Sequence, residues 1–147
     1  MRPTRSRLAF LALPSALLLV VGLVGSASAG GRPLAGTMTG AAERPAPGDV
    51  DGSGTFAFWL NAGRGEICYE LTAQGIAPAA AAHIHIGFDD IAGPVVVPLD
   101  APTGGSSAGC VDVPREKIHA MLVAPWAFYV NVHNADFPAG ALRGQLG

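Results

Sequence analysis

Beyond residue 29 the chain consists of short segments in which apolar residues occupy every second position, separated by turns rich in Gly and Pro. Side chains on a β-strand point alternately to opposite faces, so this pattern predicts strands with one buried face. The clearest case is 66–72, where Ile67, Tyr69 and Leu71 alternate with polar residues and Cys68. Strands are predicted over residues 34–39, 55–60, 66–72, 83–87, 95–99, 110–113, 126–133 and 141–146.

Two of these segments carry additional information. The run 95–99 is wholly apolar and predicts a core strand, although Pro94 and Pro98 limit its ladder of hydrogen bonds. The first and last strands share a Leu-x-Gly pattern, in Leu34-Ala-Gly and Leu142-Arg-Gly. We therefore expect these two strands to pair and to close the fold.

A single segment has helical spacing. After Pro114, Ile118 and Met121 recur at the interval of an amphipathic helix, and Ala124-Pro125 ends the segment. A helix over 114–123 is too short and too isolated for repeated β-α-β units. The predicted fold is therefore all-β: an antiparallel Greek-key β-sandwich, immunoglobulin-like or related, with about eight strands and one short helix.

The first 29 residues predict a secretory signal peptide. Three arginines precede an apolar run from Leu8 to Val24, and Ala27-Ser28-Ala29 is a typical cleavage pattern. We expect the mature chain to be one domain over residues 30–147, secreted into the extracellular space and without a membrane segment. Its length suits one domain with a modest core.

Charge narrows the classes of partner. Beyond residue 29 the chain has six basic and eleven acidic residues, and therefore a net charge of −5 with neutral histidines. The basic residues are scattered, whereas nucleic acids and anionic membranes require a clustered positive patch. Nucleic acid is thus excluded as a partner. An extracellular protein or surface ligand is expected, of unidentified kind, and the oligomeric state is not indicated.

Two cysteines, Cys68 and Cys110, occur in a chain that is predicted to be exported. An oxidising compartment and an even number of cysteines predict a disulfide between them, with two free thiols as the alternative. The bond would close a loop of about 40 residues and stabilise the fold by roughly 3–4 kcal/mol. It also requires the two Cα atoms to lie within about 7 Å.

Three of the four histidines show strand spacing. His83 and His85 are one residue apart in Ala-His-Ile-His-Ile, and His133 ends Tyr-Val-Asn-Val-His, where Asn131 shares its face. If the two strands are neighbours, the imidazoles cluster. One interpretation is a copper or zinc site, because imidazole binds both ions. The favoured interpretation is a structural network of hydrogen bonds to carbonyl groups, Asn131 or water.

A redox version of the metal site is less well supported. The H-x-H pair with a third histidine resembles the arrangement in copper–zinc superoxide dismutases, which are also β-sandwiches. Those enzymes need further histidines and an aspartate, and this chain supplies only His119, on the predicted helix. No catalytic nucleophile motif is present. The segment from Asp49 to Gly54 begins like a calcium loop, but Leu60 stands at its twelfth position, so a turn is expected instead.

Several segments together resemble the CHRD domain, named for its repeats in chordin and also found singly in secreted bacterial proteins. The match covers nearly all of the mature chain, in order and at similar spacing. It departs slightly at Asn134, where Thr is common, and at Ala141-Leu142. The resembling segments are 43–54, Ile67-Cys-Tyr-Glu-Leu71, Ala82-His-Ile-His-Ile-Gly87, Gly93-Pro-Val-Val-Val-Pro-Leu99, Tyr129-Val-Asn-Val-His133 and 137–146.

The resemblance implies an extracellular β-sandwich without an assigned chemistry, because fold alone does not define function. We therefore expect a secreted, disulfide-bonded, non-catalytic interaction or structural module. The alternative is a small extracellular copper or zinc protein that uses His83, His85 and His133, for storage or for redox chemistry. Convergence of the three imidazole nitrogens on one point would favour that alternative, because each must approach the ion to about 2.0–2.1 Å.

Overall fold

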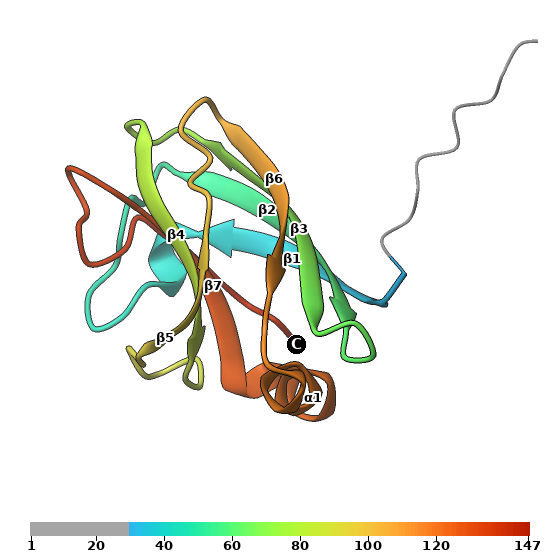
Figure 1. Cartoon of the computed structure of the whole chain (residues 1–147). Helices are drawn as coiled ribbons and strands as arrows, with labels where there is room; N and C mark the ends of the chain where they lie inside the picture. Colours follow the sequence, from blue (N-terminus) through green and yellow to red (C-terminus); the bar gives the residue numbers. More distant parts are fainter. Residues whose placement is uncertain (1–29) are drawn as a thin grey trace, which may run out of the picture.

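The alternating segments form eight antiparallel strands in one curled sheet, seen in the computed structural model of Figure 1, which describes residues 30–147. The signal peptide predicted over 1–29 lies outside the described residues. The strands are β1 (Arg32–Thr39), β2 (Ser53–Asn61), β3 (Glu66–Gln74), β4 (Ala79–Ile86), β5 (Val95–Leu99), β6 (Ser106–Asp112), β7 (Phe128–Asn134) and β8 (Leu142–Gln145). The helix α1 (Arg115–Val123) and two 3-10 turns, η1 (Gly40–Ala42) and η2 (Pro125–Ala127), complete the fold.

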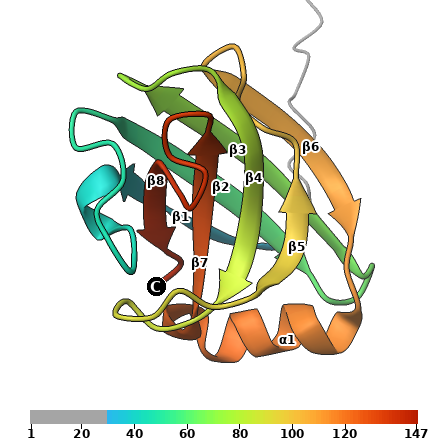
Figure 2. The same ribbon diagram turned by 90° about the vertical axis from the view of Figure 1, so that its left-hand side faces the viewer.

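The strand order is β5-β4-β7-β8-β1-β2-β3-β6. The neighbours β4 and β7, and likewise β3 and β6, are distant in sequence, which is the crossing connection of a Greek key. The first and last strands pair as predicted, at Thr39 and Arg143. Figure 2 shows β8, β7, β4 and β5 along the face turned to the viewer, with α1 below them. The predicted all-β fold with eight strands and one short helix is confirmed.

The main core fills the inside of the curled sheet. On β2 and β3 the alternation sends Phe58, Ile67 and Leu71 inward, and these side chains are at most 1 % exposed. Burying one such side chain stabilises the fold by roughly 1.5–3 kcal/mol. Ile118 and Met121, spaced one turn apart on α1, are also fully buried and close one end of the core.

The apolar run of β5 places Val97 and Leu99 in the core as predicted, but the strand lies at an edge of the sheet and not at its centre. β5 pairs only with β4 and ends the sheet, and Val95 is 49 % exposed. Proline explains the difference, because Pro98 has no N–H for a second neighbour and is tolerated at an edge. Lys117 on α1 donates a hydrogen bond from Nζ to the free carbonyl of Val96 at 2.9 Å, which covers part of this edge.

A second buried layer lies on the outer face of β4, β7 and β8. On β7, Val130 and Val132 point into the core, yet Tyr129 and Asn131 on the opposite face are each only 2 % exposed. Loops cover them: Arg143 on β8 donates to carbonyl groups of the loop after β4, at Ile91 and Phe88. These three strands are therefore apolar on the inner face and polar on the covered outer face.

Candidate metal centre

The antiparallel pairing of β4 with β7 gathers the polar residues of the outer layer. His83 lies opposite Asn131, His85 lies opposite Tyr129, and His133 lies opposite Ala81. Because the residues of such a pair point to the same side of the sheet, their side chains form one patch. The sequence did not reveal whether these two strands are neighbours, and it is the pairing of β4 with β7 that brings the histidines together.

The three imidazoles, which we call the histidine cluster (His83, His85 and His133), lie together on this face, as expected if the two strands are neighbours. One ring nitrogen from each lies within 4.8 Å of the others. The closest pair is His83 Nδ1 and His133 Nε2, at 3.1 Å. The fourth histidine, His119, is exposed on α1 and does not belong to this group.

Two rings of the cluster are oriented by backbone carbonyl groups. His85 Nδ1 lies 2.8 Å from the carbonyl oxygen of Gly93, and His133 Nδ1 lies 3.0 Å from that of Pro138. A carbonyl oxygen only accepts, so Nδ1 carries the hydrogen in both rings and Nε2 of the neutral ring is left with a lone pair. His85 Nε2 is buried and has no hydrogen-bond partner among the described residues. Metal-binding histidines are held in the same manner.

A loop over residues 87–94 holds His85 in this position. The Tyr129 ring stacks on His85 with 4.7 Å between centroids and 12° between planes, and its hydroxyl accepts a hydrogen bond from the Gly93 N–H at 3.0 Å. The Arg143 guanidinium lies 3.5 Å from the Tyr129 ring centroid. Gly93 has no room for a side chain, since a Cβ would lie 1.7 Å from the Ile86 carbonyl oxygen.

The electrostatics of the cluster favour neutral rings. Burial lowers the pKa of His83, of His85 and of His133 below the usual value of 6.5. Charge on the neighbouring rings lowers the pKa of His83 further. Since a metal ion binds the deprotonated nitrogen, the cluster is in its binding form near neutral pH.

A buried acid lies next to the cluster. Glu43, in the loop after η1, is 3 % exposed, and its Oε1 has no hydrogen-bond partner within residues 30–147. Burial raises the pKa of Glu43 to about 7, while the charge of Arg143 and hydrogen bonding from Asn131 act in the opposite direction. On its other side, Asn131 contacts the cluster through Oδ1, which lies 3.0 Å from His133 Nε2.

Sequence reasoning identified only part of this site. The alternation in β7 put Asn131 on the face of His133, and a similar alternation in β8 could have drawn attention to Arg143. Glu43 had no comparable signal, because the segment between β1 and β2 has no periodic pattern. The calcium-loop segment forms the expected turn, in which the Gly52 N–H donates to the Asp49 carbonyl oxygen at 3.1 Å.

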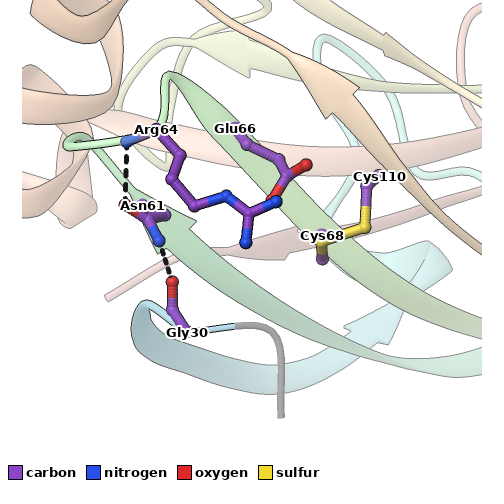
Figure 3. Close-up of polar contacts among 6 residues, drawn as sticks. All are labelled: Gly30, Asn61, Arg64, Glu66, Cys68 and Cys110. Carbon is purple, nitrogen blue, oxygen red and sulfur yellow. Dashed lines mark hydrogen bonds and ion pairs between the residues drawn. A yellow bond between two sulfur atoms is a disulfide. The ribbon is translucent and has the colours of Figure 1, made fainter. Parts of the chain in front are cut away.

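The disulfide between Cys68 and Cys110 is confirmed, with 3.9 Å between the Cα atoms (Figure 3). It links the directly opposed positions of β3 and β6. Glu66 lies close to both sulfur atoms, but cysteines joined in a disulfide are not thiolate ligands, and Glu66 is paired with Arg64 at 3.4 Å. In this region Asn61 also bonds the carbonyl of Gly30 (Figure 3). The Cys68–Cys110 disulfide is therefore a structural cross-link, and with Glu66 it does not form a metal site.

Comparison with known families gives one match, to the CHRD domain model, over residues 34–146. No curated protein and no solved structure matches the chain significantly. Within residues 30–147 no helix combines the length and the apolar character needed to cross a membrane. The family match extends from β1 to the residue after β8 and includes every strand of the histidine cluster. This chain belongs to the CHRD domain family.

Proposed function

We propose that this CHRD domain is a secreted, non-catalytic extracellular module that binds one copper or zinc ion at the histidine cluster. The leader-like first 29 residues and the disulfide support export to an oxidising compartment. The metal site is supported by the geometry of the three rings and by the groups that orient them. It unites the two interpretations of the sequence, since binding one ion requires no redox chemistry.

The first support is distance. Nitrogen ligands at about 2.0–2.1 Å from a tetrahedral ion lie about 3.4 Å from one another. The nitrogens of His83 and His133 are 3.1 Å apart, and the whole cluster lies within 4.8 Å. Side-chain rotations that move the ring nitrogens by about 1 Å therefore suffice to form a site. Three imidazoles without a thiolate suit zinc and copper.

The observation that carries the proposal is the unpartnered Nε2 of His85. In a purely structural network this buried atom would have a hydrogen-bond partner, because leaving it without one costs roughly 1–3 kcal/mol. Its ring is instead fixed by Gly93 so that the free lone pair is presented inside the protein. A metal ion would satisfy this lone pair, and no group within residues 30–147 makes a hydrogen bond to it.

The test is a metal titration of protein purified without an affinity tag and stripped with a chelator. Isothermal titration with Zn²⁺ and with Cu²⁺ should give one equivalent for the wild type. His85→Ala should lose stoichiometric binding, whereas the exposed control His119→Ala should retain it. At an ion concentration 100 times Kd, binding should also raise the wild-type unfolding free energy by about 2.7 kcal/mol.

Two results would contradict the proposal. One is a wild-type protein that takes up neither ion at stoichiometric level. The other is equal loss of binding in the His85→Ala and His119→Ala variants, which would place the ion elsewhere. The unfolding measurement keeps the test valid if a variant is less stable, because the ion-dependent increment is compared within each variant.

A further inference from the structure

Three imidazoles leave one position of a four-coordinate ion to be filled. Asn131 lies two residues before His133 on β7 and opposite His83 across the ladder, and its Oδ1 is 3.0 Å from His133 Nε2. We propose that Asn131 Oδ1 is the fourth protein ligand of the ion, and that the buried Glu43 positions this amide. This inference rests on the proposed function, since it completes the same site.

The first step concerns the hydrogens between Asn131 and His133. Because His133 Nδ1 donates to Pro138, the neutral ring presents a lone pair at Nε2, and the amide oxygen of Asn131 also presents only lone pairs. Two lone pairs that face each other at 3.0 Å repel unless a hydrogen or a cation lies between them. His83 Nδ1 can supply one hydrogen to His133 Nε2, but none to Asn131. A bound cation satisfies all of these atoms.

The second step concerns the orientation of the amide. Turning its NH₂ toward His133 would remove the repulsion, but it would also turn the amide oxygen toward Glu43, which lies next to Asn131. The Glu43 carboxyl offers an accepting oxygen whether or not it is ionised, so the NH₂ group faces Glu43 and the amide oxygen faces His133. The amide also lies near His85, where it favours the protonated ring. No hydrogen bond of acceptable geometry reaches His85 Nε2, however, so that lone pair stays free.

The third step is the burial of Glu43, which is unfavourable in itself. A carboxyl group that is 3 % exposed and has one oxygen without a partner destabilises the fold. The group is also tightly confined, because a Cβ on Gly140 would come within 2.4 Å of its carboxylate. A role in orienting and polarising the Asn131 amide accounts for an acid at this position, much as outer groups orient the ligands of other metal sites.

The chemistry of this ligand set indicates which ions it takes. Three neutral nitrogens and a hard amide oxygen suit Zn²⁺ and Cu²⁺ better than Cu⁺, which prefers softer sulfur ligands. Asn131 is therefore a specificity-determining residue. Its removal should weaken the binding of divalent ions more than that of Cu⁺.

The test uses two substitutions at residue 131 in the full mature chain. Asn131→Leu keeps the branched shape of the side chain but has no oxygen, and it should weaken Zn²⁺ binding about 10- to 100-fold. Asn131→Asp retains an oxygen and adds charge, so it should bind Zn²⁺ at least as tightly as the wild type. The electron paramagnetic resonance spectrum of bound Cu²⁺ should change in both variants, because a ligand of the ion changes.

Controls separate this inference from the proposed function. His119→Ala, at an exposed position on α1 outside the cluster, should leave the Cu²⁺ spectrum unchanged. Glu43→Gln should weaken Zn²⁺ binding about tenfold. If His85→Ala abolishes binding while Asn131→Leu and Asn131→Asp match the wild type in affinity and spectrum, Asn131 is not a ligand and the histidine site stands. If the wild type binds no ion, both proposals fail.

Discussion

Replacement of Glu43 by Gln should change how the stability of the metal-free protein depends on pH. Burial raises the pKa of Glu43 from 4.5 to about 7, so the folded state holds this proton more tightly than the unfolded chain does. One pKa unit corresponds to 1.36 kcal/mol, and the shift therefore corresponds to about 3 kcal/mol. The side chain is 3 % exposed, so solvent screening reduces this magnitude little.

The sign follows from the raised pKa. Below about pH 4.5 Glu43 is protonated in both states, and its burial carries no electrostatic cost. As the pH rises through about 7 the folded protein loses this advantage, and the wild type becomes less stable by about 3 kcal/mol. Glutamine cannot ionise, so the unfolding free energy of Glu43→Gln should gain about 3 kcal/mol relative to wild type between about pH 4.5 and pH 8.

The assay is urea unfolding in the presence of a chelator at several pH values across this range. Only the difference in unfolding free energy between variant and wild type is diagnostic, because ionisation of the histidines changes the stability of both proteins with pH in the opposite direction. Their lowered pKa values mean that the stability they contribute is lost as the pH falls below about 6.5. Glu70→Gln, at an exposed position on β3, is the matched control. If the difference in unfolding free energy between Glu43→Gln and wild type stays constant within 1 kcal/mol over this pH range, the assigned cost of burying Glu43 is refuted.

Two further predictions concern the disulfide and the loop. The double variant Cys68→Ser, Cys110→Ser should have an unfolding free energy about 4 kcal/mol lower than the wild type, because the disulfide joins residues 42 positions apart. Denaturant unfolding measures this loss, and a value below 1 kcal/mol would contradict the chain-entropy argument. Gly93→Ala should weaken Zn²⁺ binding at least about tenfold, because the new Cβ displaces the loop that orients His85. The control is Gly104→Ala, where a Cβ meets nothing within 4 Å, and equal affinities of the two variants in a titration would show that the loop does not matter.

The strands and the single helix could be read from local pattern. Alternation in β2, β3 and β7 was sufficient, because one face of each strand lies in the core and the repeat of two is visible over a few residues. The run in β5 shows the limit of this reasoning. Its composition indicates a core strand, but composition does not reveal where in the sheet that strand lies, and Pro98 admits only a position at the end of the sheet.

For the candidate site, the sequence predicted only which residues of a single strand share a face. The spacing of His83 and His85 on β4 determines that they share a face, and the same holds for Asn131 and His133 on β7. The period of two does not tell which strands are neighbours, however, and β4 meets β7 through a long-range Greek-key connection. The prediction of a cluster was conditional on this pairing, and the structure supplied it.

By itself the amino-acid sequence predicted a signal for export, and it determined the all-β pattern, the pairing of two cysteines and the CHRD family. These features depend on composition and on spacing within a few residues, or on motifs in order along the chain. The tertiary structure alone decided that loops bury the outer face of β4, β7 and β8, and that Glu43 and Arg143 join the histidines there. The physical reason is that burial and pKa depend on groups brought together from distant segments, which no local pattern encodes.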